Sequence, residues 1–82
     1  MPPAGQRQYY FSLNISQQEF YKYYQGAADG VIVVAECGRR LRFPARRLRP
    51  FLSYRGIRGR FCLQVDQDNR FLSLQQVGTR RY

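Results

Sequence analysis

The sequence lacks histidine altogether and carries only five acidic residues among 82. Histidine is the commonest general base of enzymes. The carboxylates that could replace it are scattered along the chain, at Glu19, Asp29, Glu36, Asp66 and Asp68. No GxxxxGK[ST] or GxGxxG phosphate-binding motif occurs. Two cysteines without histidine also cannot supply the four ligands of a structural zinc site. The sequence therefore predicts a protein that is not an enzyme and holds no metal or other cofactor.

Long apolar segments are missing as well. The longest wholly apolar run is Val31–Ala35, whereas a membrane-spanning helix needs roughly 20 such residues. The first residues, MPPAGQRQ, contain no signal-peptide core. We therefore expect a cytoplasmic protein without membrane contact, in which Cys37 and Cys62 stay reduced.

Basic residues are abundant and unevenly placed. Thirteen arginines and one lysine give a formal net charge of +9. Nine of the arginines lie within Arg39–Arg60, which contains no acidic residue, and the charges of the remaining residues sum to zero. A local excess of this kind attracts polyanions, and the planar guanidinium both binds phosphate bidentately and stacks on rings. The segment predicts a polyanion-binding surface, with a merely solvated charged face as the alternative.

The arginines of this segment fall into three groups, on a hairpin, on a proline-flanked turn and beside two glycines. We expect Tyr54, and Tyr10 on an outward strand face, to stack on bases or sugars next to them. If roughly six to nine guanidiniums share one face, the log–log salt dependence of nucleic-acid binding should have a slope of roughly −4 to −6. The candidate site for nucleic acid or another polyanion consists of Arg40, Arg42, Arg46, Arg47, Arg49, Arg55, Arg58 and Tyr54.

Apolar patterning predicts five strands. Four of them are expected to bury alternate residues, whereas the second, a β-branched run, is expected to be buried on both faces. In chain order the expected strands cover Tyr9–Ser16, Val31–Cys37, Arg39–Phe43, Arg60–Asp66 and Phe71–Val77. The inward residues expected from alternation are Tyr9, Phe11, Leu13, Ile15, Leu41, Phe43, Phe61, Leu63, Val65, Leu72 and Leu74.

One short helix is expected after the first strand. Ser16 and Glu19 fit a capping box, and the helix then covers Gln17–Gln25 and ends at Gly26. Its aromatic residues are expected to pack in the core as one stripe, with a ligand platform as the alternative; they are Phe20, Tyr23 and Tyr24.

Prolines and glycines divide the remaining chain. Pro44 and Pro50 exclude a long strand or helix over Pro44–Tyr54, so a single helical turn is expected around Ala45–Arg49, with Leu48 buried beneath the arginines. The remaining turns are expected at Gly38, between Gly56 and Gly59, and over Asp66–Arg70.

These elements predict an α+β fold. The expected architecture is a strongly bent, mostly antiparallel five-stranded sheet, or a small open barrel, with one short helix after the first strand. A composition of 44% hydrophobic residues supplies enough apolar area to fold despite the charge. The single compact domain is expected over residues 9–77, with flexible tails at residues 1–8 and 78–82.

Three blocks of the sequence are similar to a known family. YYFSLNIS at Tyr9–Ser16, GRRLRFPARRLRPF at Gly38–Phe51 and GIRGRF at Gly56–Phe61 resemble the recurring blocks of short gammaproteobacterial proteins known as a domain of unknown function. The similarity spans roughly Tyr9–Val77. It implies a stand-alone bacterial cytosolic domain and brings with it no activity, ligand or catalytic residue.

A second, shorter resemblance concerns two arginines. Arg42 and Arg46 have the R-x-x-x-R spacing of the pair with which PilZ-type barrels bind cyclic dinucleotides. The companion pattern of those domains, an acidic or amide residue followed by S-x-x-G, is absent around Asp68, Asn69 and Ser73.

Three functions are consistent with these patterns. The preferred one is a small binding module for RNA or DNA, without a base code. The alternatives are an adaptor that docks on an acidic protein surface, with its exposed β-edge contributing, and a cyclic-dinucleotide-binding barrel.

Overall fold

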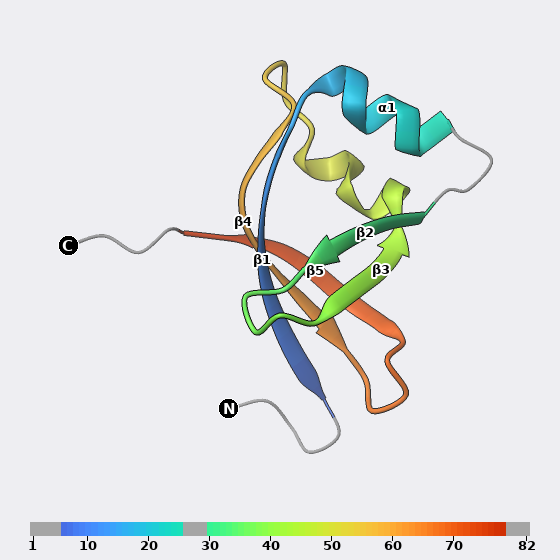
Figure 1. The fold of residues 1–82 in the computed structure, drawn as a ribbon, viewed down its shortest axis with the longest axis vertical. Helices are drawn as coiled ribbons and strands as arrows, with labels where there is room; N and C mark the ends of the chain where they lie inside the picture. The colour runs from blue at the N-terminus through green and yellow to red at the C-terminus, as the bar shows by residue number, and fades with distance from the viewer. Residues whose placement is uncertain (1–5, 26–29, 79–82) are drawn as a thin grey trace.

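The computed structural model describes residues 6–25 and 30–78 (Figure 1). The elements of this part are β1 (Arg7–Ile15), α1 (Gln17–Gln25), β2 (Gly30–Val34), β3 (Arg40–Pro44), the 3₁₀ helix η1 (Ala45–Phe51), β4 (Ile57–Val65) and β5 (Phe71–Val77). Their types and order are as predicted, although β1 and β4 begin earlier and β2 ends earlier. Most of the expected tail residues lie outside the described residues.

The five strands form two antiparallel sheets. β4 lies between β1 and β5 in a three-stranded sheet, and β2 pairs with β3 in a separate hairpin. The backbone N–H of Glu36, just after β2, donates to the carbonyl oxygen of Tyr10 in β1 at 2.7 Å and ties the hairpin to the larger sheet.

The mostly antiparallel arrangement with one helix after the first strand is therefore confirmed. The single five-stranded sheet is not, and the described strands close no barrel. Pro44 explains part of the difference, because it has no backbone donor with which to continue a ladder. The chain turns there into η1, which leads over the core to β4.

The two sheets share one hydrophobic core. The ring centroid of Phe11 in β1 lies 5.8 Å from that of Phe43 in β3 and 5.6 Å from that of Phe61 in β4. Phe20 of α1 and Leu48 of η1 are fully buried in the same cluster. Figure 1 shows α1 across one end of the sheets, with η1 between α1 and the hairpin. The two helical elements therefore cover this end of the core, and η1 confirms the predicted helical turn.

The predicted capping box starts α1. Ser16 Oγ accepts from the backbone N–H of Glu19 at 3.1 Å, and Glu19 Oε1 accepts from the N–H of Ser16 at 3.2 Å. Both groups are otherwise orphan donors of a helix start. The predicted end at Gly26 lies outside the described residues.

The aromatic stripe predicted on α1 is right for one residue only. Phe20 is fully buried, but Tyr23 is 43% exposed and Tyr24 37%. Tyr21 packs on the core instead. Because the short helix lies over the end of the sheets, only the side that carries Phe20 and Tyr21 meets the core.

The prediction that β2 is buried on both faces is wrong. Val31 and Val33 are buried, whereas Ile32 is 63% and Val34 60% exposed. A two-stranded hairpin has the larger sheet on one side only, so its second face meets solvent. The alternation predicted for β3 is confirmed, because Leu41 and Phe43 are buried and Arg40 and Arg42 are exposed.

The turn before β4 differs from the predicted glycine loop. Ser53 and Gly56 exchange two backbone hydrogen bonds of 2.9 Å, and β4 begins directly afterwards at the fully buried Ile57. Gly56 has a φ of +94°, and a Cβ there would collide with the carbonyl oxygen of Ile15. Glycine is therefore required where β1 and this turn meet. Gly59 lies within β4 and closes no loop.

A register shift overturns one inward residue predicted for β5. Adjacent residues of β4 pair with Phe71 and Ser73, which leaves Leu72 as the extra residue of a β-bulge. Leu72 is consequently 44% exposed, while Phe71 and Leu74 pack on the core.

Replacing Phe61 tests the shared core. Phe61 is fully buried between the rings of Phe11 and Phe51, so Phe61→Ala should lower the free energy of unfolding by roughly 3–5 kcal/mol through the cavity it leaves. Denaturation followed by circular dichroism measures this change. The control Leu72→Ala, at the exposed bulge, should shift it by less than about 0.5 kcal/mol. Native-like stability of Phe61→Ala would contradict the assigned strand faces.

The β4–β5 turn makes stability depend on pH. Asp66 Oδ1 accepts from the backbone N–H groups of Arg70 at 2.9 Å and Asp68 at 2.8 Å, and its Oδ2 accepts from Arg70 Nε at 3.0 Å. The hydrogen bond from the Arg70 backbone is the main reason that the pKa of Asp66 lies below its ordinary value of 3.8. Its stabilisation is therefore fully present above that ordinary value and is lost as the pH falls through the lowered pKa.

We accordingly expect the wild type to exceed Asp66→Asn in free energy of unfolding at pH about 6, and the difference to shrink towards pH about 2. Urea denaturation at a series of pH values checks this. A difference that stays constant over the series would show that the carboxylate charge of Asp66 is irrelevant to the turn.

Candidate nucleic-acid interface

Most arginines of the segment Arg39–Arg60 form no ion pair with a described carboxylate. The exception is Arg60, whose Nε and Nη2 lie 2.7 and 2.8 Å from the two carboxylate oxygens of Glu36. This hydrogen-bonded pair raises the pKa of Arg60 above its ordinary value. The other ion pairs among the described residues join Arg70 to Asp66 and Asp68. Eight arginines of the segment thus remain available to an external anion as far as residues 6–25 and 30–78 are concerned.

Aromatic rings, rather than carboxylates, hold several of these guanidiniums. The Cζ atom of Arg47 lies 4.4 Å from the ring centroid of Phe71, and that of Arg49 lies 5.5 Å from the ring centroid of Tyr24. The Cζ atom of Arg39 lies 5.9 Å from the ring centroid of Tyr9. Such cation–π contacts restrain long side chains without neutralising them. The guanidiniums are therefore partly ordered before any ligand arrives.

Four open hollows lined by described residues follow one another along this surface. Three arginines of the β2–β3 hairpin line the first hollow, which shares Arg42 with the second. The second hollow shares Pro44 with the third, and the third shares Arg46 with the fourth. Arg47 lines the fourth. Arg49 adjoins the third, because its Nη1 donates to the hydroxyl of Tyr24 at 3.4 Å. The arginines along this line, here called the arginine strip, are Arg39, Arg40, Arg42, Arg46, Arg47 and Arg49.

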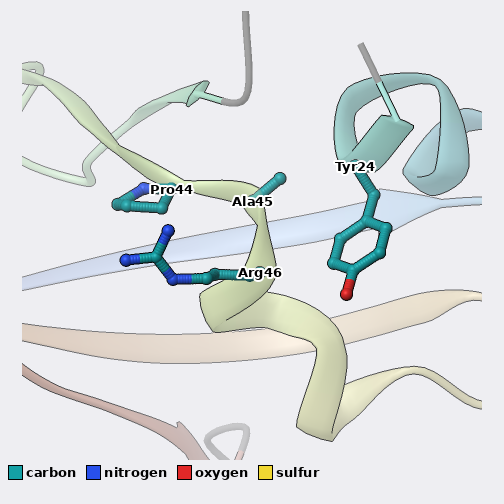
Figure 2. A pocket seen from close by; sticks show the side chains of 4 residues that line it. All are labelled: Tyr24, Pro44, Ala45 and Arg46. Carbon is teal, nitrogen blue, oxygen red and sulfur yellow. The ribbon is translucent and has the colours of Figure 1, made fainter. Parts of the chain in front are cut away.

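The third hollow lies where α1, β3 and η1 meet. Tyr24 comes from the last turn of α1, Pro44 ends β3, and Ala45 and Arg46 begin η1. Figure 2 shows the Tyr24 ring on one side of the backbone at Ala45 and the Arg46 guanidinium on the other side, beside Pro44. An aromatic surface and a cation thus border one hollow.

Gly30 leaves room for the side chain of Arg42, one arginine of the strip. A Cβ at Gly30 would lie only 2.7 Å from Nε and 3.2 Å from Nη2 of Arg42. The Arg42 guanidinium therefore lies directly over the β2 backbone at Gly30. Gly30 itself pairs across the hairpin with Pro44. The absence of a side chain at Gly30 lets Arg42 lie flat beside the hollow that both residues line.

Three of the eight predicted site residues lie apart from the strip. Tyr54, 82% exposed, and Arg55 occupy the turn beside the start of α1, where Gln17 Nε2 donates to the Ser53 carbonyl at 2.8 Å. Arg58 lies on the face of β4 that points away from the core. The hairpin face with Arg40 is on the other side of that core. The structure therefore brings together Arg40, Arg42, Arg46, Arg47 and Arg49 and separates them from Tyr54, Arg55 and Arg58.

Tyr10, the second ring predicted to stack on a ligand, already has a partner. The Arg60 guanidinium lies 4.5 Å from its ring centroid, and Glu36 holds that guanidinium. The ring contacts of the strip come instead from residues interpreted as core or strand, namely Tyr9, Tyr24 and Phe71. The position of Tyr24 four residues after Phe20 favoured packing, and no local pattern distinguishes a half-exposed ring at the edge of a core from a buried one.

The R-x-x-x-R pair spans two elements. Arg42 lies on the exposed face of β3 and Arg46 in the first turn of η1, and the hollows that they line meet at Pro44. Because the described strands close no barrel, the resemblance to PilZ-type barrels concerns these two arginines alone.

These features define a small, mostly antiparallel β domain with one short α-helix and a line of ring-stacked arginines. Residues 7–77 match the family described as "Protein of unknown function (DUF2835)", and the chain belongs to this family. The family membership predicted from the three sequence blocks is thereby confirmed, while the gammaproteobacterial origin stays a prediction. Comparisons with curated proteins and with solved structures gave no match. In the described part of the chain, neither helical element has the length and apolarity of a membrane span.

Proposed function

We propose that this domain is a small, non-enzymatic module that binds nucleic acid, RNA or DNA, through the arginine strip. The observation that carries this proposal is the unbroken line of hollows bordered by six arginines, none of which pairs with a described carboxylate. A chain of phosphates is the ligand that offers one anionic group after another along such a line. A cytoplasmic location, where such ligands are plentiful, belongs to the proposal.

Two further arguments support phosphate binding that does not depend on the base sequence. Guanidiniums that are restrained by rings lose less side-chain entropy when they engage a phosphate. Contacts to phosphate position a ligand but do not read its sequence.

The described acidic side chains already make structural contacts, which is consistent with a binding role without catalysis. Glu19 accepts a hydrogen bond at the start of α1, Glu36 binds Arg60, and Asp66 and Asp68 bind Arg70. Each of the four described carboxylates thus has a structural partner, and no general base is left over among them.

A second candidate, an adaptor that docks on an acidic protein, is favoured by one observation. The exposed face of the hairpin carries Ile32 opposite Arg42 and Val34 opposite Arg40, and both aliphatic side chains are more than half exposed. Interfaces between proteins combine an apolar centre with complementary charge. Phosphate groups gain no contact from aliphatic side chains. Ile32→Ser with Val34→Ser should therefore weaken docking of a protein and leave binding of nucleic acid nearly unchanged, which separates the two candidates.

A salt series tests the function. We expect fluorescence anisotropy to report binding of a labelled 12-nucleotide strand near 0.1 M salt, with a log–log slope of roughly −4 if all six arginines of the strip contact phosphates, and roughly −5 on a duplex. Cyclic dinucleotides serve as a further probe. Absence of binding to every polynucleotide near 0.1 M salt, with retention of an acidic partner that Ile32→Ser with Val34→Ser releases, would replace this proposal with the adaptor.

Charge reversal within the strip gives the second test. Arg46→Glu with Arg47→Glu should weaken binding more than tenfold, because two phosphate contacts become repulsions. Both side chains are exposed, so the variant should keep a native circular dichroism spectrum. Arg55→Glu with Arg58→Glu makes the same change of charge away from the strip and should weaken binding clearly less. Equal losses in the two variants would mean that net charge, and not the strip, determines affinity.

A further inference from the structure

Arg46 lines two hollows that are each bordered by at least one aromatic ring. It lines the third hollow with Tyr24 and the fourth with Arg47 and Phe71. Their volumes are about 290 and 360 Å³, near the lower end of the roughly 300–1,000 Å³ common for small-molecule pockets. Each hollow therefore suits one planar ring system better than a complete nucleotide cofactor.

The Tyr24 ring is fixed in place yet incompletely covered. The Phe20 ring stacks on it with a centroid distance of 5.4 Å and an interplanar angle of 28°. Arg49 donates to its hydroxyl and lies towards its ring. The side chain nevertheless stays 37% exposed at the third hollow. Because the Arg46 guanidinium lies across the Ala45 backbone from this ring (Figure 2), a ligand that contacts both must combine a flat apolar part with an anionic part.

The fourth hollow offers the same combination. Phe71 lies beneath the Arg47 guanidinium, 4.4 Å from ring centroid to Cζ. Pro50 and the half-buried Phe51 add apolar surface beside them. Planar bases stack on aromatic rings and also on the flat face of arginine, so this hollow can receive a second base.

We propose, building on the nucleic-acid function above, that the arginine strip binds single strands and that these two hollows hold two successive unpaired bases. In a strand one phosphate joins neighbouring nucleotides, and Arg46, which lines both hollows, is the cation available to that phosphate. Bases of a duplex are already paired and stacked and cannot enter. Stacking accepts every base, so the site tolerates many sequences.

Oligonucleotides of equal length test the proposal on the wild-type protein, and the abasic strand also matches the backbone charge of the intact single strand. The probes are 12-nucleotide single strands of RNA and of DNA, the blunt duplex of the same length, and a strand of 12 abasic residues. We expect the abasic strand and the duplex to bind about fivefold more weakly or worse at one salt concentration, since each stacked base contributes strongly. The RNA and DNA arms show which sugar the site prefers.

A tryptophan reporter locates the base. The chain has no tryptophan, so Tyr24→Trp introduces a single reporter at the third hollow. Tyr23→Trp is its matched control at the preceding position, which lines none of the four hollows. Stacked bases should quench the emission of Tyr24→Trp and leave Tyr23→Trp nearly unchanged. The abasic strand should quench neither.

Affinity of alanine variants provides a second readout. Tyr24→Ala should weaken binding of the single strand about fivefold or more and of the abasic strand by less than about twofold. Tyr24→Phe keeps the ring against Phe20 and should bind nearly as the wild type does, and Tyr23→Ala should as well. Thermal melting of each variant confirms that it is folded.

The outcomes separate this inference from the function on which it rests. Equal affinity for the intact strand, the abasic strand and the duplex, with binding still lost in Arg46→Glu with Arg47→Glu, would overturn base binding and leave phosphate binding in place. Equal quenching of the two tryptophan variants would overturn it as well. Failure of every polynucleotide to bind would remove the proposed function itself.

Discussion

The contact of Phe11 with Phe43 and Phe61 is the interaction on which the rest of the structure depends. A two-stranded hairpin is marginally stable alone. Among the described residues, the β2–β3 hairpin is joined to the larger sheet by the Glu36–Tyr10 backbone hydrogen bond, by the Glu36–Arg60 ion pair and above all by this aromatic packing. Burial of Phe43 determines where β3 lies and where Pro44 starts η1. The positions of the arginines on both elements follow from it.

A domain with this much positive charge must restrain its arginines without cancelling them. Nine like charges within one segment oppose compaction, yet the described carboxylates are used at the start of α1, at Arg60 and in the β4–β5 turn. Aromatic rings restrain Arg39, Arg47 and Arg49 instead. A ring orders a guanidinium and leaves its N–H donors free, which is the property that a phosphate-binding surface requires.

The fold also divides the surface by chemistry. The arginine strip passes from the hairpin over η1 to β5, while the outer face of the hairpin carries an exposed aliphatic pair and the outer face of β4 carries Arg58. The aliphatic pair lies opposite Arg40 and Arg42 of the strip, so a nucleic-acid strand and a protein docked on the hairpin face would both contact these two arginines. The proposed function and its alternative therefore share the hairpin arginines, and they are distinguished by the aliphatic pair on one side and by the η1 arginines on the other.

Local chemistry in the sequence determined the elements: alternation placed Tyr9 and Phe11 inward, the capping box started α1, and Pro44 marks the point where β3 ends and η1 begins. It also determined the family and the positive charge. Tertiary structure alone decided that the strands form two sheets, that Ile32, Val34 and Leu72 face solvent, and which arginines lie together. The reason is that burial and proximity depend on which elements pack against each face. That packing joins Tyr24 to Arg49 and Phe71 to Arg47, residues 24 or 25 positions apart in the chain, beyond the range of any local pattern.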